Sequence, residues 1–188
     1  MGFSFISLDI ETTGISIENE IIEVGAVEFR NGEPERFFSS LINPKIPIPP
    51  NIISLTGIKN EDVENAPCFD EIKEELAIFI GDLPVVGHNI TSFDLPFLKK
   101  KGLEIYNPVL DTLPLSSKIL PQLKRRKLDD VAKALGVEIG IRHRALPDAI
   151  LSGKVLVGLI EKLSSLEEEE KEKVLEIFPN IVLLGVEI

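Results

Sequence analysis

The sequence predicts an α/β fold with a mixed sheet, in which an antiparallel hairpin adjoins parallel strands and helices flank both. Near the N-terminus, two β-rich runs flank the pair Asn31-Gly32, which is a strong signal for a tight hairpin turn. After residue 69, short apolar runs alternate with segments of helical periodicity, a pattern typical of helices packed on a partly parallel sheet. The length of 188 residues allows one domain with a substantial core.

The first part of the chain predicts three strands. Residues 3–11 begin with a run that is apolar on both faces, as expected for a central strand. Residues 20–30 are rich in Ile and Val, and with 36–42 they would form the two arms of the hairpin. Residues 43–51 are Pro-rich and are expected to form an extended connection, too short to separate two domains.

The second part predicts helices that alternate with short strands. Residues 69–81 carry apolar side chains at helical spacing and end in a glycine, and Thr91 or Ser92 is expected to cap a helix that stops at Gly102. The other expected elements are a short helix from Asn60 or Asp62 to Pro67, strands at 83–89 and near 109, helices near 112–120, 127–137, 147–163 and 166–178, and a strand-like tail at 180–188.

The composition excludes several kinds of site. A single cysteine, Cys68, rules out an internal disulfide and a cysteine-rich zinc site, and His88 and His143 are too few for a histidine-rich one. Any metal is therefore expected to be a hard cation with oxygen ligands. No apolar stretch has membrane-spanning length and the N-terminus lacks signal-peptide features, so we expect a cytoplasmic protein without a membrane partner.

The net charge of −11 is unevenly distributed. Residues 99–144 contain 11 Lys and Arg against 5 Asp and Glu, whereas the rest of the chain is strongly acidic. The basic run at 124–127 could follow a phosphate backbone, although a solvated surface explains it equally well. Lys99 to Lys101 are interpreted as cations at a helix C-terminus, which the helix dipole favours.

Two carboxylates end the first predicted strand. Asp9 and Glu11 are two residues apart, so they would point to the same face at a separation of about 7 Å. Their repulsion is tolerable on a solvated surface or around a cation. Because the carboxyl ends of strands are where α/β proteins bind ligands, a cation site is a reasonable alternative to a solvated face.

Two further acidic segments follow a similar pattern. Asp94 lies at the start of a predicted helix, where capping alone would explain it, but Asn89 and Phe93 add an amide and an aromatic ring suited to a single-stranded nucleic acid. His143 precedes Asp148 by five residues, in a loop that enters a helix. Beside metal-bound carboxylates, a neutral imidazole at this position could take a proton from water.

Taken in order, "LDIETTG" (8–14), "HNITSFD" (88–94) and "HRALPDA" (143–149) resemble the three motifs of the DEDD-type 3′–5′ exonucleases, in the histidine subtype. This is the family of the proofreading epsilon subunit of bacterial DNA polymerase III. The likeness extends to "ISLTGI" (53–58) and "LDT" (110–112) and covers roughly residues 3–163. It implies a ribonuclease H-like fold, with an exonuclease domain at 1–165. The acidic tail at 166–188 falls outside the resemblance; we expect a helix and a strand-like end packed on the same domain, and docking of a partner is the alternative.

The resemblance also implies roles for individual residues. Four carboxylates would bind two divalent cations, Mg²⁺ or Mn²⁺, and His143 would be the general base. The four carboxylates are those of Asp9, Glu11, Asp94 and Asp148. The positions near the terminal nucleotide would be Thr12, Ile15, Leu55, Thr56, Asn89 and Phe93. Asp111 is expected to serve in a turn or cap, not as a fifth ligand.

The expected activity is removal of nucleoside 5′-monophosphates from single-stranded or frayed 3′ ends of DNA, in proofreading or repair. Lys124, Arg125 and Arg126 would then contact phosphates. Two alternatives stay open: an exonuclease that trims RNA 3′ ends, and a binding module without activity. The expected protein partner is a DNA polymerase or a helicase. The sequence does not separate a free-standing enzyme from a polymerase subunit or a fragment of a larger protein.

Overall fold

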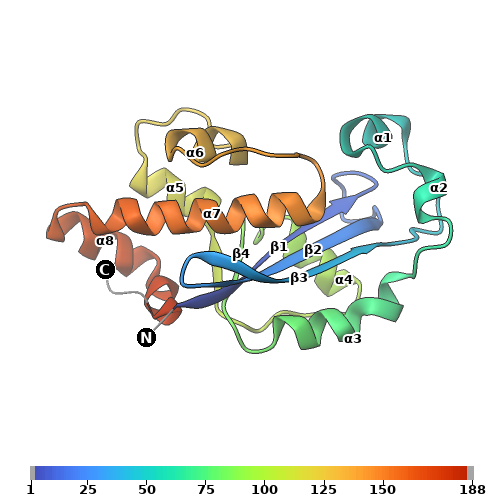
Figure 1. The fold of residues 1–188 in the computed structure, drawn as a ribbon, viewed down its shortest axis with the longest axis horizontal. Coiled ribbons are helices and arrows are strands. Elements are labelled where there is room, and N and C mark those ends of the chain that lie inside the picture. Colours follow the sequence, from blue (N-terminus) through green and yellow to red (C-terminus); the bar gives the residue numbers. More distant parts are fainter. Residues whose placement is uncertain (1–2, 186–188) are drawn as a thin grey trace.

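Strand β1 (Ser4–Thr12) is the centre of a five-stranded sheet in the computed structural model, which describes residues 3–185 (Figure 1). The strand order is β3-β2-β1-β4-β5. The pairs β1–β2 and β2–β3 are antiparallel, whereas β4 and β5 continue the sheet parallel to β1. The remaining strands are β2 (Ile21–Arg30), β3 (Glu33–Leu41), β4 (Val85–Gly87) and β5 (Val109–Asp111). The mixed sheet predicted from the sequence is confirmed.

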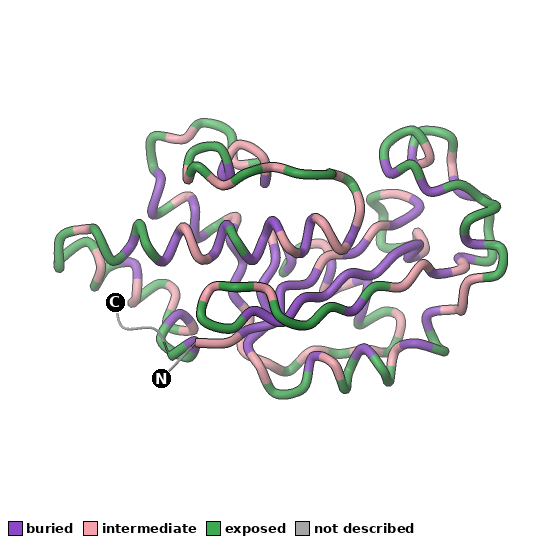
Figure 2. The backbone as a smooth tube through the Cα atoms, viewed as in Figure 1, coloured by how far each residue is buried: buried purple, intermediate pink, exposed green. Residues whose placement is uncertain are grey.

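Helices cover both faces of this sheet. On one face, α3 (Phe69–Ile80) and α4 (Asp94–Lys100) enclose a cluster that includes Ile6 and Leu8 of β1. The opposite face is covered by α5 (Thr112–Ile119), α6 (Leu128–Ala134) and α7 (Ala145–Ser164). These helices enclose a second cluster around Phe5 and Phe29, whose rings stack with centroids 4.9 Å apart. Figure 2 shows the buried residues concentrated in the strands and along α7.

Shorter helices close the two ends of the molecule (Figure 1). At one end, α1 (Pro50–Thr56) and α2 (Asn60–Val63) pack over a small cluster that contains Ile22 and Ile52. At the other end lie α8 (Glu168–Ile177) and the 3₁₀-helix η1 (Pro179–Leu184), whose Val174, Ile181 and Leu184 join the cluster beneath α7. Within residues 3–185, no helix is both long and apolar enough to cross a membrane.

Helix α1 was not expected from the sequence, because the Pro-rich run was interpreted as extended as far as residue 51. The helix begins at Pro50 and ends before Gly57, whose φ is 74°. A proline is well tolerated in the first helical turn, because the N–H it lacks would have no partner there. The glycine adopts the left-handed conformation that often ends a helix. The Pro-rich segment thus contains the start of a helix, which its proline content alone does not indicate.

The expected cap of α4 is wrong. The helix begins at Asp94 after Phe93, without a side-chain cap. The Thr91 hydroxyl instead donates a hydrogen bond to Asp111 at 2.6 Å. Asp111 itself accepts from the Leu113 N–H at 3.0 Å as the N-cap of α5, which agrees with its expected capping role.

The expected C-terminal strand is also wrong where the structure describes it. Residues 179–184 form η1, in which Ile181 and Leu184 are buried three residues apart, the repeat of a 3₁₀-helix. The Asn180 side-chain amide donates to the Val109 carbonyl at 3.0 Å, so this segment meets β5 through a side chain and not through a strand ladder. Residues 186–188 of the predicted strand lie outside the described residues.

Helix α7 approaches β2 unusually closely at two glycines. A Cβ atom at Gly25 would lie 2.3 Å from the Leu146 backbone nitrogen and 2.4 Å from the Ala145 carbonyl carbon. A Cβ atom at Gly153 would lie 2.2 Å from the Phe29 ring. Both distances are far below van der Waals contact. The absence of a side chain at these positions therefore sets the distance between α7 and the sheet.

We predict that Gly25→Ala destabilises the protein, because the added methyl group meets rigid backbone of α7 and not a flexible side chain. Overpacking of this kind costs about 1–3 kcal/mol, which lowers the melting temperature by roughly 2–10 °C in a domain of this size. Thermal unfolding followed by circular dichroism measures the effect. Gly140→Ala is the matched control, because a Cβ atom there meets nothing within 4 Å. Equal melting temperatures for the two variants would contradict the close-approach argument.

Candidate active site

Three of the four carboxylates singled out from the sequence meet at the carboxyl end of β1. Ligand oxygens of Asp9, Glu11 and Asp148 all lie within 4.8 Å of one another. Asp9 and Glu11 are on the face of β1 that is covered by α7, and Asp148 is in the first turn of that helix. Strand β1 and helix α7 are far apart in the sequence but are joined by a hydrogen bond. The Ser7 hydroxyl donates to the Ala149 carbonyl at 2.7 Å.

The fourth carboxylate, Asp94, reaches β1 from the opposite layer. It is the first residue of α4 and is 3% exposed. One of its oxygens accepts a hydrogen bond from the Ile10 N–H at 3.0 Å, between the two acidic residues of the strand. Asp94 is outside the group of three whose oxygens are mutually within 4.8 Å. Its negative charge is close enough to raise the pKa of Asp9.

The start of α7 is fixed by a residue that sequence reasoning missed. Glu23 of β2 is 2% exposed, and its carboxylate accepts from the Ala145 N–H at 2.8 Å. The Arg144 guanidinium donates to both oxygens of the same carboxylate at 2.6–3.1 Å. Such a bidentate pair is directional as well as strong. Together with the close packing at Gly25, it positions Asp148 opposite β1.

Burial and mutual repulsion oppose ionisation of this cluster. Burial, followed by the neighbouring charges of Asp94 and Glu11, raises the pKa of Asp9 well above its ordinary value. Burial and the charge of Glu23 raise the pKa of Glu11 to about 7. Burial raises the pKa of Asp94 to about 7, although hydrogen bonds from backbone N–H groups act in the opposite direction. A nearby cation would relieve this repulsion.

One such cation is supplied by the chain itself. Arg142 lies in the loop before α7 and forms ion pairs with Asp129 of α6 and with Asp148. Its side chain is 18% exposed. These contacts were not predicted, because Arg142 belongs to a basic region of the sequence and its partners come from two different helices.

His143 lies beside Asp148, as its spacing suggested. Its backbone N–H donates to Asp148 at 3.0 Å, and its φ of 59° is in the left-handed region. That conformation is uncommon for a residue with a side chain. The residue is exposed, so its imidazole is accessible from solvent at the edge of the carboxylate cluster.

The loop between β1 and β2 carries two of the expected substrate contacts. Thr12 is buried, and its hydroxyl donates to the Gly14 carbonyl at 2.7 Å. Ile15 is 92% exposed. An isoleucine this exposed makes almost no contribution to the core, so its apolar surface is free to contact a ligand.

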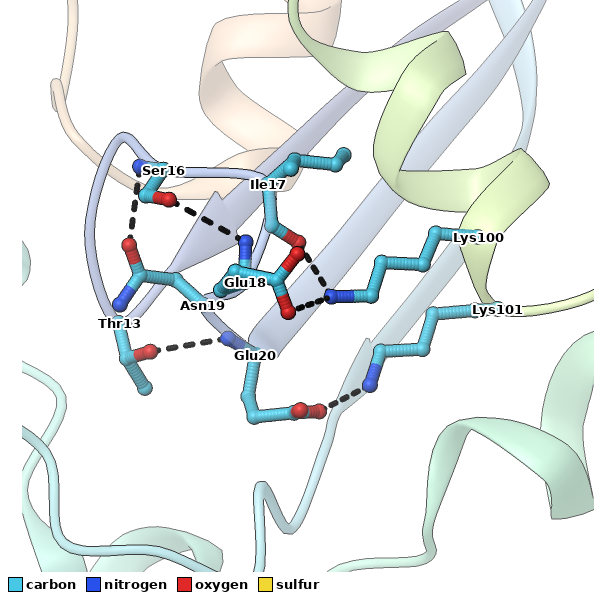
Figure 3. Close-up of polar contacts among 8 residues, drawn as sticks. All are labelled: Thr13, Ser16, Ile17, Glu18, Asn19, Glu20, Lys100 and Lys101. Carbon is cyan, nitrogen blue, oxygen red and sulfur yellow. Dashed lines mark hydrogen bonds and ion pairs between the residues drawn. The ribbon is translucent and has the colours of Figure 1, made fainter.

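Lysines from the end of α4 hold this loop in place (Figure 3). Lys100 donates to the Ile17 carbonyl at 2.9 Å and to the Glu18 carboxylate at 2.8 Å, and Lys101 pairs with Glu20. The two side chains extend side by side toward the loop in the view of Figure 3. The sequence interpretation of these lysines as helix-end cations is therefore incomplete, because they also anchor the loop that follows β1.

Leu55 and Thr56 differ in how far their side chains are exposed to solvent. Leu55 lies on α1 and is 50% exposed. Thr56 is buried, and its hydroxyl donates to the Ile52 carbonyl at 2.9 Å while accepting from the Ile58 N–H at 3.1 Å. The Thr56 hydroxyl thus stabilises the end of α1, and Leu55 presents the accessible apolar surface.

Asn89 and Phe93 belong to the turn between β4 and α4. Asn89 has a φ of 66°, and Asp111 accepts its N–H at 2.8 Å, which holds this conformation. Phe93 is half-buried and packs against Phe97, with ring centroids 5.0 Å apart. The turn is thus fixed by β5 and by the core of the α4 layer.

The basic run lies in the connection between α5 and α6. Lys124 and Arg125 are exposed, whereas Arg126 is half-buried and donates to the Pro121 carbonyl at 3.4 Å. The Arg126 carbonyl accepts from the His88 ring at 2.8 Å. Since His88 directly follows β4, this bond joins the basic loop to the carboxyl edge of the sheet.

The donor set fits a hard divalent cation. The clustered ligand atoms are all carboxylate oxygens, which Mg²⁺ and Mn²⁺ prefer over nitrogen or sulfur. The raised pKa values of Asp9 and Glu11 reflect negative charge held close together in a buried place, and a cation would stabilise that charge.

Comparisons with known proteins identify the chain's relatives. The family model described as exonuclease (RNase T) matches residues 6–156. The DNA polymerase III PolC-type protein of Clostridium perfringens is 40% identical over 164 residues, which are 85% of this chain and 11% of that protein. The DNA polymerase III subunit epsilon of Aquifex aeolicus is 36% identical over 166 residues, which are 85% of this chain and 82% of that protein.

Solved structures of other exonucleases share the fold. A solved structure of exonuclease X in complex with 5′ overhanging duplex DNA superposes with a TM-score of 0.73 at 22% identity, over 90% of this chain and 98% of that one. The chain spans about a tenth of the length of the PolC-type relatives that it matches. The chain belongs to this exonuclease family, as its match to the family model and its similarity to the DNA polymerase III subunit epsilon of Aquifex aeolicus show.

Proposed function

We propose that this chain removes nucleoside 5′-monophosphates one at a time from the 3′ ends of DNA. The observation that carries the proposal is the convergence of Asp9, Glu11 and Asp148, with Asp94 bonded to the strand between the first two. Because relatives are named as DNA polymerase III epsilon and PolC-type proteins, we further propose that the activity proofreads or repairs newly made DNA beside a polymerase.

The four carboxylates would hold two divalent cations, Mg²⁺ or Mn²⁺. When bound, such ions neutralise charge on the scissile phosphate and lower the pKa of water. His143 is proposed as the general base that takes the proton from the attacking water. Its place in an exposed loop, fixed to Asp148 through its backbone N–H at 3.0 Å, supports that role.

The remaining contacts would position the nucleic acid. Ile15, in the loop between β1 and β2, and Leu55, on α1, are both exposed and are proposed to pack against the terminal base. Thr12, Thr56, Asn89 and Phe93 would shape the rest of this subsite, chiefly by fixing the turns that carry it. Lys124, Arg125 and Arg126 are proposed to contact phosphates, since they adjoin the carboxyl edge of the sheet through His88.

Digestion of end-labelled oligonucleotides tests the function directly. With Mg²⁺ or Mn²⁺, 5′-labelled single-stranded DNA should shorten in single-nucleotide steps from its 3′ end, and EDTA should stop the reaction. Matched duplex DNA and single-stranded RNA form the comparison arms. Faster degradation of RNA than of DNA would reassign the substrate, and an unchanged label pattern on every substrate would reject the nuclease proposal.

We predict that His143→Ala lowers kcat by about 10²–10⁴-fold, the usual contribution of a general base, while DNA affinity changes little. Single-turnover kinetics and fluorescence anisotropy with labelled DNA measure the two quantities. The imidazole is exposed, so the variant should melt at the wild-type temperature, which excludes misfolding as the cause. A wild-type rate would remove His143 from the mechanism.

We predict that the metal-free protein loses stability as the pH rises from about 5 to about 7. The folded-state pKa values of Glu11 and Asp94 are raised to about 7, above ordinary values near 4, so the folded state binds more protons than the unfolded state in this window. Melting temperatures in EDTA at a series of pH values measure the slope. Asp94→Asn should flatten it, and so should saturating Mn²⁺, which favours the ionised carboxylates. A melting temperature in EDTA that is independent of pH would contradict this prediction.

A further inference from the structure

The loop that enters α7 places a positive charge directly on the carboxylate cluster. Arg142 forms one ion pair through its Nε with Asp129 and a second through Nη1 with Asp148. Its side chain is 18% exposed and that of Asp148 is 7% exposed. An ion pair at this depth is less screened by solvent than a surface pair, and each partner is costly to leave alone.

Among the described residues near the cluster, Arg142 is the cation that bonds to one of the grouped carboxylates. The other nearby guanidinium, that of Arg144, donates to both oxygens of Glu23 and is thereby engaged in holding α7 on β2. Arg142 thus supplies positive charge in direct contact with Asp148, and its charge also lowers the pKa values of Asp9 and Glu11.

The two oxygens of Asp148 are both engaged. Oδ2 accepts the His143 N–H at 3.0 Å, and Oδ1 bonds to Arg142. A metal ion bound to Oδ1 of Asp148 would lie beside the Arg142 guanidinium, and the two positive charges would repel each other. The backbone donor is fixed by the loop and the start of α7. The guanidinium can move away from Asp148, because its ion pair with Asp129 can hold it nearby.

We propose that Arg142 is an internal counter-cation that exchanges with the metal ions: it neutralises Asp148 in the metal-free protein and is retained by Asp129 when metal binds. This inference rests on the metal site of the proposed function. It assigns Arg142 a positioning and regulatory role and no part in the chemical step. Asp129, the second residue of α6, becomes the holding site for the displaced side chain.

Arg142→Gln tests the exchange by two measurements that do not depend on nuclease activity. In EDTA, the variant should melt several degrees below the wild type, because the carboxylates lose their counter-charge. In saturating Mn²⁺, the two proteins should melt at the same temperature. Calorimetric titration should show that the variant binds Mn²⁺ about tenfold more tightly, a factor within the usual range for coupled sites. Lys133→Gln, an equal charge change at an exposed position of α6, is the control and should change none of these values.

A double-mutant cycle separates exchange from a general effect of charge. Asp129→Asn should weaken Mn²⁺ binding in the wild-type background, because Arg142 then has only Asp148 to bind. In the Arg142→Gln background, the same substitution should have no effect. An equal effect of Asp129→Asn in both backgrounds, or an equal loss of melting temperature in EDTA and in Mn²⁺, would overturn the role of Arg142. Failure of the wild type itself to bind Mn²⁺ would overturn the proposed function as well.

Discussion

The gathering of negative charge at the carboxyl end of β1 is the constraint on which the surrounding structure depends. Carboxylates held this close in a poorly solvated place repel one another and resist ionisation. The fold compensates by directing donors at them. The Ile10 and His143 N–H groups bond to Asp94 and Asp148, both of which lie in the first turn of a helix, where the dipole favours negative charge.

The same constraint explains why α7 is fixed so firmly to β2. Asp148 contributes to the cluster only if the first turn of its helix lies within a narrow distance of the strand. Gly25 and Gly153 allow the backbone and the Phe29 ring to approach, and Glu23 bonds to the helix start through Arg144 and the Ala145 N–H. Steric fit sets the distance, and the bidentate ion pair between Arg144 and the buried Glu23 sets the orientation.

Much of this arrangement could be predicted from the sequence, because it depends on local periodicity and on one rule of sheet topology. The apolar strands, the Asn31-Gly32 turn and the carboxyl-end position of Asp9 and Glu11 follow from such patterns. Helix α1 and the 3₁₀-helix at 179–184 could not be predicted in this way. The prolines before α1 are typical of extended chain as well as of a helix start, and a short apolar run is compatible with both a strand and a helix. Glu23 and Arg142 were missed for a different reason. Their roles consist of ion pairs between segments that only the folded chain brings together.

The bond between Ser7 and Ala149 joins positions 142 residues apart and has a consequence for biosynthesis. A polypeptide is made from its N-terminus at about 5–20 residues per second, so β1 leaves the ribosome many seconds before α7 is made. During that interval the nascent polypeptide contains Asp9 and Glu11 but not yet Asp148. The acidic cluster therefore cannot assemble until the start of α7 has left the ribosome, because Asp148 is supplied by that helix.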